Sequence, residues 1–182
     1  MKKLIEDIMQ RLVSTQTRSR YIDEDWGQLD YYSPSPPTKW PCILVDLGDA
    51  QWEGMGELIQ TGRAQVIIRV ASMRLSNTNV KAPQAQRDKA AEIHDLLTDI
   101  HVALHGWTGD SMNGPMTRQS TRRMKREDGI REFMLIYNVQ VVDTSAKRVL
   151  DTRKVHGSEV DLTVTVAKGV RAADPPFSIP GP

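Results

Sequence analysis

The stretch Met116–Asp143, MTRQSTRRMKREDGIREFMLIYNVQVVD, decides the fold of this chain. Its first part is polar and rich in arginine, and it ends at Glu127-Asp128-Gly129, residues that favour a tight turn. A run rich in β-branched and aromatic residues follows that turn. The stretch therefore predicts a β-hairpin.

The second strand of this hairpin carries apolar side chains on both faces. One face holds Phe133, Leu135, Tyr137, Val139 and Val141, and the other holds Met134, Ile136 and Val142. A strand with one solvent-exposed face would alternate apolar and polar residues more regularly. We therefore expect a helix or a neighbouring subunit to cover part of the second face.

A long amphipathic helix is predicted just before the hairpin, from about Pro83 to His105. Its apolar residues recur at helical spacing: Ile93, Leu96, Leu97, Ile100 and Leu104. Pro83 suits a first helical position, and Gly106 is a natural terminator. A shorter helix is predicted over residues 3–14 from the same kind of spacing.

Two further strands are expected between these helices. Cys42–Leu47 is a nearly continuous apolar run that reads as a buried strand, extending toward Trp52. Ala64–Met73 alternates and reads as a second strand antiparallel to the first. The glycines between them, Gly54, Gly56 and Gly62, predict a flexible connection.

The segment 21–41 is predicted to be irregular, because its prolines bar a helix or a central strand. Its aromatic residues either fasten this loop to the core or form a partner surface: Trp26, Tyr31, Tyr32 and Trp40.

Residues 144–182 have a different sequence pattern from the rest of the chain. Residues 144–156 are charged and without periodicity, which is typical of a linker. An alternating strand follows, with Val160, Leu162, Val164 and Val166 on one face, and the end, ADPPFSIPGP, is proline-rich. We expect a folded domain over residues 1–143 and a C-terminal arm over 144–182.

Composition sets the broad class. The 182 residues are 39% hydrophobic and 26% charged, with a net charge of +1, so the chain is neither a polycation nor a polyanion. The N-terminal MKKLIEDIMQ lacks the apolar run of a signal peptide, and no segment matches a membrane helix. Cys42, the single cysteine, has apolar neighbours and is expected in the core, so we expect synthesis in a cytosol.

The sequence gives little support for a catalytic site or a metal site. His101 and His105 form an H-x-x-x-H pair, but Val102 stands where a metalloprotease needs its glutamate. The carboxylates Asp46, Asp49 and Glu53 have no specific metal spacing and no His or Lys in the next loop. We therefore expect no catalytic residue, no metal and no cofactor.

A basic cluster is the strongest local signal, and it consists of Arg118, Arg122, Arg123, Lys125, Arg126 and Arg131. Six cations on one hairpin could meet phosphate or an acidic protein partner. The predicted first strand has no aromatic residue for base stacking, and Glu127, Asp128 and Glu132 partly neutralise the tip. These features favour an assembly or channel-facing surface. A nucleic-acid-binding surface is the alternative.

Four segments resemble the tail terminator, or tail completion, proteins of long-tailed bacteriophages and prophages. They are WPCILVDLGDAQ, RAQVIIRVA, DIHVALHGW and STRRMKREDGIREFMLIYNVQVVD, in the order short helix, loop, strand pair, long helix and hairpin. The resemblance covers about residues 1–143 and rests on this element order and texture. It implies an α+β fold, in which a mostly antiparallel sheet carries a short N-terminal helix and a long central helix.

The resemblance also implies a function. Such proteins form rings, typically hexamers, that cap the tail tube, stop its growth and face the head-side connector, while DNA passes through the channel. The implied partners are copies of the chain itself, the tail tube protein and the neck proteins, in a virion made in the bacterial cytoplasm. The C-terminal strand of Val160, Leu162, Val164 and Val166 would add to a neighbouring subunit. This arm departs from the compact pattern, so a head-closure or other neck role stays open.

Overall fold

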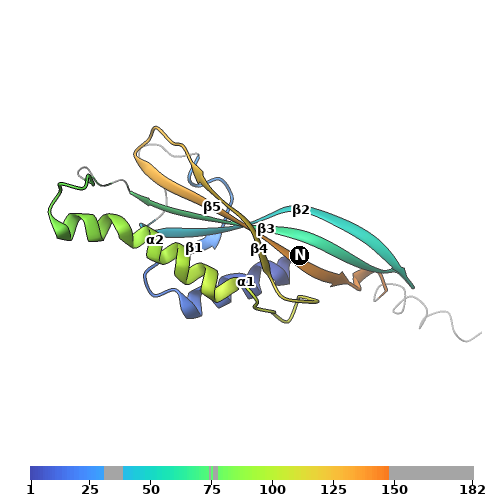
Figure 1. The fold of residues 1–182 in the computed structure, drawn as a ribbon. Coiled ribbons are helices and arrows are strands. Elements are labelled where there is room, and N and C mark those ends of the chain that lie inside the picture. Colours follow the sequence, from blue (N-terminus) through green and yellow to red (C-terminus); the bar gives the residue numbers. More distant parts are fainter. Residues whose placement is uncertain (31–38, 74, 76–77, 148–182) are drawn as a thin grey trace, which may run out of the picture.

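The computed structural model describes residues 1–30, 39–73, 75 and 78–147 of the chain. The main elements follow one another in the order α1 (Lys2–Thr15), β1 (Tyr21–Glu24), β2 (Cys42–Gly56), β3 (Ile59–Met73), α2 (Gln84–Leu104), β4 (Thr117–Met124) and β5 (Ile130–Asp143). The strands form one sheet in the order β1-β2-β3-β5-β4, and both helices lie on the same face of it (Figure 1). The fold is therefore α+β, as the sequence predicts.

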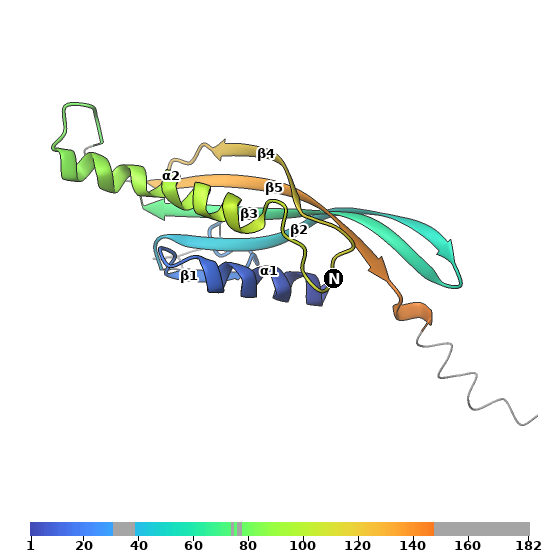
Figure 2. The ribbon, with the colours of Figure 1, turned by 60° about the horizontal axis from the view of Figure 1, so that its bottom comes forward.

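The strand pairing is antiparallel except at one edge. β2 pairs with β3, β3 with β5, and β5 with β4 in antiparallel register, whereas β1 pairs with β2 in parallel over Cys42–Val45 alone. The predicted strands Cys42–Leu47 and Ala64–Met73 are confirmed as parts of longer strands of 15 residues each. The sheet is thus long relative to the two helices that cover it (Figure 2).

The main core lies between the helices and one face of the sheet. Helical spacing brings Leu4, Ile8 and Leu12 of α1 against the sheet, and α2 contributes Ile93, Leu96, Ile100 and Leu104. The strand face opposite them is the one that the alternation predicts: Phe133, Leu135, Tyr137, Val139 and Val141 are all buried. Each fully buried aliphatic side chain contributes about 1.5–3 kcal/mol to stability. This layer therefore supplies most of the apolar burial that stabilises the fold.

A smaller apolar cluster covers one end of the opposite sheet face. Leu29, Cys42, Leu44, Ala71 and Ile130 are buried there. Trp40 packs against this cluster, whereas Trp26 is 59% exposed, and Tyr31 and Tyr32 lie outside the described residues. Burial raises the pKa of the Cys42 thiol to about 12, which fits the inert core residue that the sequence predicts.

Two predictions about connections were wrong. Residues 21–41 were expected to be irregular throughout, but Tyr21–Glu24 forms β1, a strand too short to show alternation. The glycine-rich link was expected to be flexible, but β2 and β3 continue to Gly56 and Ile59, which pair with each other. The connection is therefore the two-residue turn Glu57–Leu58.

The link between α2 and β4 is tied back to α1. The carboxylate of Asp7 accepts hydrogen bonds from the backbone N–H and the hydroxyl of Ser111, at 3.0 and 2.6 Å. Arg11 donates from Nε to the carbonyl of Ala103 and lies 5.7 Å from the Trp107 ring centroid. These contacts fix α1 to the end of α2 and so position both helices on the sheet.

The predicted arm, residues 144–182, is described only to Lys147, so Val160, Leu162, Val164 and Val166 lie outside the described residues.

Candidate assembly surface

The histidine pair of α2 lies where the helix meets the start of β4. The rings of His101 and His105 have centroids 4.8 Å apart, and Nδ1 of His105 accepts the backbone N–H of Arg118 at 3.2 Å. Burial, together with the nearby positive charge of Arg118, lowers the pKa of His101. Among the described residues, no group of three or more His, Cys, Asp or Glu side chains is placed to hold a metal.

The three carboxylates of β2 are spread along the strand and do not form a site. Asp46 is half-buried, and burial raises its pKa, helped by the charge of Asp25. Asp49 and Glu53 are exposed further along β2. Paired acid–base chemistry needs two carboxylates beside one substrate position, and a spread of this kind does not provide it.

The basic cluster divides into two groups. Arg126 and Arg131 are tied to the body of the protein, because Arg126 joins an ion-pair network and Arg131 donates to the carbonyl of Ala90 at 2.8 Å. The other four cations, Arg118, Arg122, Arg123 and Lys125, are exposed on β4 and just after it. The surface available to a partner is therefore β4 itself.

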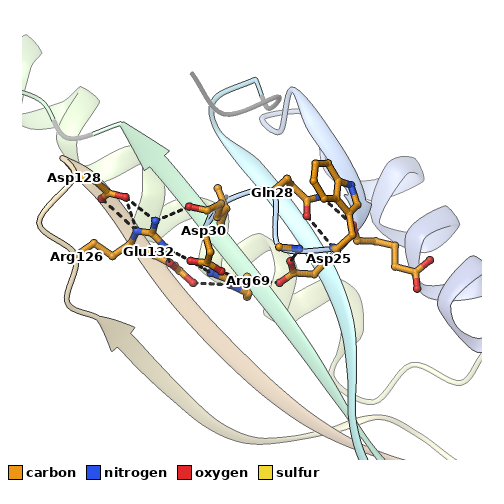
Figure 3. A network of polar contacts seen from close by, with 11 residues as sticks. Asp25, Gln28, Asp30, Arg69, Arg126, Asp128 and Glu132 are labelled. Atoms are coloured by element: carbon orange, nitrogen blue, oxygen red, sulfur yellow. Dashed lines mark hydrogen bonds and ion pairs between the residues drawn. The ribbon is translucent and has the colours of Figure 1, made fainter. Parts of the chain in front are cut away.

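Two arginines hold the ion-pair network, which joins three separate parts of the chain (Figure 3). Arg69 of β3 meets Asp25 at 2.8 Å, Asp30 at 2.9 Å and Glu132 of β5 at 2.6 Å. Arg126 meets Asp30 at 2.9 Å, Asp128 at 2.6 Å and the same Glu132 at 2.8 Å. The network fastens both the loop after β1 and the β4–β5 turn to the sheet.

Charge balance explains why this network is stable although it is partly buried. The side chain of Glu132 is 2% exposed, and each of its two carboxylate oxygens faces one guanidinium. Burial disfavours the charge of Arg69, but its bonds to Glu132, Asp30 and Asp25 outweigh that effect and raise its pKa. A paired and fully hydrogen-bonded carboxylate is tolerated inside a protein, whereas an unpaired one is not.

Sequence reasoning missed this network because its pairing depends on register. Arg69 lies opposite Met134 and Glu132 lies opposite Ala71, so the two charged residues are diagonal neighbours across β3 and β5. The available signal was the charge of Arg69 inside the apolar run VIIRVA, which calls for a buried partner. Which residue that partner is follows only from the strand alignment.

The β2–β3 hairpin projects beyond both helices (Figures 1 and 2), and apolar side chains are exposed along it. Trp52, Met55 and Leu58 are 36%, 64% and 50% exposed, and Val142 of β5 is 39% exposed. Trp52 lies over Gly62, where an added Cβ would come within 2.6 Å of its ring. Met55 and Leu58 thus expose apolar surface at the end of the hairpin, whereas Trp52 lies beside the start of α1 and lines a hollow together with Leu4 and Val141.

The turn at this end is conformationally unfavourable. Glu57 and Leu58 have φ angles of 49° and 64°, the left-handed region that a two-residue hairpin turn of type I′ requires at both positions. Asn and Gly take up these angles easily, whereas other residues are strained by roughly 1–2 kcal/mol each. Strain of this kind often marks a functional position, where the side chain matters more than the turn.

Comparisons with known proteins found similar solved structures but no similar sequence family. No protein-family model matches the chain, and no curated protein matches it. A chain of the solved structure described as "Virion of native gene transfer agent (GTA) particle" is similar. It is 12% identical in sequence, with a TM-score of 0.49, and the match covers 77% of this chain and 95% of that one.

Among the described residues, no helix is both long and apolar enough to cross a bilayer.

Proposed function

We propose that this chain is a structural, non-enzymatic subunit of a phage virion, which assembles as a ring at the head-proximal end of the tail. There it ends the growth of the tail tube and joins the tail to the head connector. The segments that resemble tail terminator proteins support this assignment, because they form β2, β3, the end of α2 and the β4–β5 hairpin. These are the elements that build the sheet and its main core.

The projecting apolar end of the β2–β3 hairpin carries the proposal. It exposes Met55 and Leu58, and its turn keeps Leu58 at a strained left-handed position. Exposed apolar side chains clustered on a projecting ribbon mark a contact with another protein. We assign this contact to the tail tube, since a cap must bind the last ring of the tube tightly enough to stop further addition.

The implied partners follow from this position. Copies of the chain form the ring, which we expect to be a hexamer. The tail tube protein binds on one side and the connector or neck proteins bind on the other. DNA passes through the channel without a tight grip, which suits a net charge of +1. The residues Val160, Leu162, Val164 and Val166 serve in this proposal as an arm that adds to a neighbouring subunit.

Binding to purified tail tubes tests the proposal. The variant Met55→Ser/Leu58→Ser removes apolar surface from the hairpin end, and Val13→Ser/Val102→Ser removes it from the outer faces of α1 and α2, where these valines are 65% and 74% exposed. We expect the parent and the helix variant to pellet with tubes and to appear as a cap at one end in negative-stain images. The hairpin variant should bind at least about tenfold more weakly, which corresponds to about 1.4 kcal/mol.

Two outcomes would contradict the proposal. One is a parent protein that neither forms rings nor caps tubes. The other is an equal loss of binding in the hairpin and helix variants, which would show that the hairpin end has no special part in the contact.

A nucleic-acid-binding module is the second candidate, and the exposed cations of β4 favour it. A hollow of about 800 Å³ between α2 and the β4–β5 turn is lined by Arg123, Lys125 and Arg131 among others. If this surface binds DNA, the affinity should fall steeply with salt, and Arg122→Ala/Arg123→Ala/Lys125→Ala should reduce the salt slope by about one for each lost phosphate contact. A parent protein without measurable DNA binding at low salt would remove this candidate.

A further inference from the structure

The sheet ends in two edges that the described residues leave largely uncovered. β1 pairs with β2 only as far as Val45, and beyond it no described strand lies along the outer side of Asp46–Gly56. β4 is the outermost strand on the other side, and its outer N–H at Arg118 is bound by His105. From Ser120 to Met124, no strand of the described part covers β4. Uncovered edges of this kind can accept a strand from another chain.

The two edge strands carry opposite charge. β2 contains Asp46, Asp49 and Glu53 and no basic residue, whereas β4 contains Arg118, Arg122 and Arg123 and no acidic residue. No ion pair joins any of these six side chains to another described residue. Each edge thus presents charge that the described part of the same subunit does not pair, and the two edges are complementary.

Strand direction allows the two edges to meet. β2, β3, β5 and β4 alternate in direction along the sheet, so β2 and β4 run in opposite directions. When a second copy stands the same way up, its β2 is therefore antiparallel to the β4 of the first copy. This contact joins two different surfaces, so it can be repeated from copy to copy and closes into a ring when the rotation permits.

The register also places opposite charges on one face. Arg122 lies opposite Met134 of β5, and Glu53 lies opposite Thr61 of β3, which in turn lies opposite Val142. Met134 and Val142 are separated by an even number of residues on β5, so they share a sheet face. Arg122 and Glu53 therefore both point to the face opposite the helices, but their levels differ by the eight residues from Met134 to Val142. A second copy displaced along the strands by about 27 Å, at about 3.4 Å per residue, brings them together and sets the uncovered part of β4 beside the uncovered part of β2.

We propose that the β4 edge of one copy binds the β2 edge of the next, with Arg122 meeting Glu53 across the contact. This inference rests on the proposed ring and names the surfaces that form it. Charged residues on an edge strand can also have the opposite role, which is to prevent association. The two roles predict opposite results for charge reversal, so an experiment can separate them.

The experiment reverses the charges singly and together and measures self-association of the full chain by sedimentation equilibrium. Arg122→Glu and Glu53→Arg should each weaken association at least about tenfold, because like charges then face each other. The double variant Arg122→Glu/Glu53→Arg should recover most of the loss. Lys89→Glu, at an exposed position of α2 away from both edges, should leave association unchanged, and circular dichroism should show that all variants are folded.

The outcomes for the edge contact and for the proposed function differ. If the parent forms rings and the single reversals do not weaken them, or the double variant fails to recover, the edge contact is wrong while the ring assignment stands. Stronger association of Arg122→Ser or Glu53→Ser would show that the charges keep copies apart, which also overturns the contact. A parent that does not self-associate, either alone or on tail tubes, contradicts both.

Discussion

At Arg69, one guanidinium binds three carboxylates from distant parts of the chain, and its removal should be strongly destabilising. Arg69→Leu leaves Oε1 of Glu132 without its partner, although Arg126 still pairs with Oε2. Losing one member of a buried pair has an effect of about 3 kcal/mol or more on the free energy of unfolding. Urea denaturation of the parent and the variant measures this difference.

The matched double variant shows whether the unpaired charge is the cause. Arg69→Leu/Glu132→Leu removes the buried carboxylate together with its partner, so it should be more stable than Arg69→Leu alone. A double variant that is less stable than Arg69→Leu would mean that the network matters mainly through Arg126 and Glu132.

Asp30 gives the network a dependence on pH. Its hydrogen bond to Arg69 is the main cause of its lowered pKa, and its contacts with Arg126 act in the same direction. Because the folded pKa is below the unfolded value, Asp30 stabilises the protein above that unfolded value. The stability is lost as the pH falls through the folded pKa. Asp30→Asn should thus be less stable than the parent at pH 7, and the difference should shrink between about pH 5 and about pH 2.

Thermal unfolding across this pH range checks the prediction. Glu24→Gln, at an exposed position of β1 outside the network, is a suitable control and should follow the parent. If the difference between Asp30→Asn and the parent is the same at every pH, the ionised carboxylate is not what stabilises the loop.

At the scale of elements, long periodic segments were predictable and irregular ones were not. α2 and β5 repeat their apolar residues over several turns or pleats, so sequence alone placed them within a few residues of Gln84–Leu104 and Ile130–Asp143. β1 has four residues, and its place in the sheet depends on pairing with β2. Glu57 and Leu58 are residues that tight turns rarely use, so the sequence predicts a flexible loop at the nearby glycines instead of this turn.

The same limit applies to the candidate surface. The six cations of the β4–β5 hairpin are close in sequence, but only the fold shows that Arg126 faces Asp30 and Glu132. Local charge patterns predict where cations gather, whereas the distant carboxylates decide which cations remain available. The sequence likewise does not predict which strands form the two edges of the sheet, because that depends on the strand order.

The β2–β3 turn offers a test of strain at the level of one element. Glu57→Asn/Leu58→Gly supplies the residues that type I′ turns prefer, so it should stabilise the hairpin by about 1 kcal/mol or more. The loss of the 2.7 Å pair between Glu57 and Lys147 matters little, because exposed pairs contribute little. We expect a higher melting temperature together with weaker binding to tail tubes, since the Leu58 side chain is gone.

A variant with the opposite behaviour would separate the two effects. If Glu57→Asn/Leu58→Gly is less stable than the parent, the turn is not strained. If it is more stable and binds tubes equally well, the tube contact does not use Leu58.

At the scale of the whole molecule, the position of the helices decides which surfaces remain for partners. α1 and α2 both cover one face of the sheet, and the network around Arg69 fastens the loop that covers one end of the other face (Figures 1 and 3). The projecting hairpin, the two charged edges and the half-buried Ile67, Met134 and Ile136 remain outside the main core. The β2 edge and the hairpin end belong to one projecting ribbon, whereas β4 forms the opposite edge of the sheet.

Ionic strength should separate the two kinds of contact that this arrangement implies. The β2 and β4 edges attract each other through exposed charges, and the Debye length falls from about 10 Å at about 0.1 M salt to about 3 Å at about 1 M. Ring formation through these edges should therefore weaken with salt. Binding of the apolar hairpin end to the tail tube should persist or strengthen, because it depends on apolar burial. Sedimentation of the protein alone and pelleting with tubes across this range measure both, and a ring that salt does not weaken would mean that apolar surface, not charge, joins its subunits.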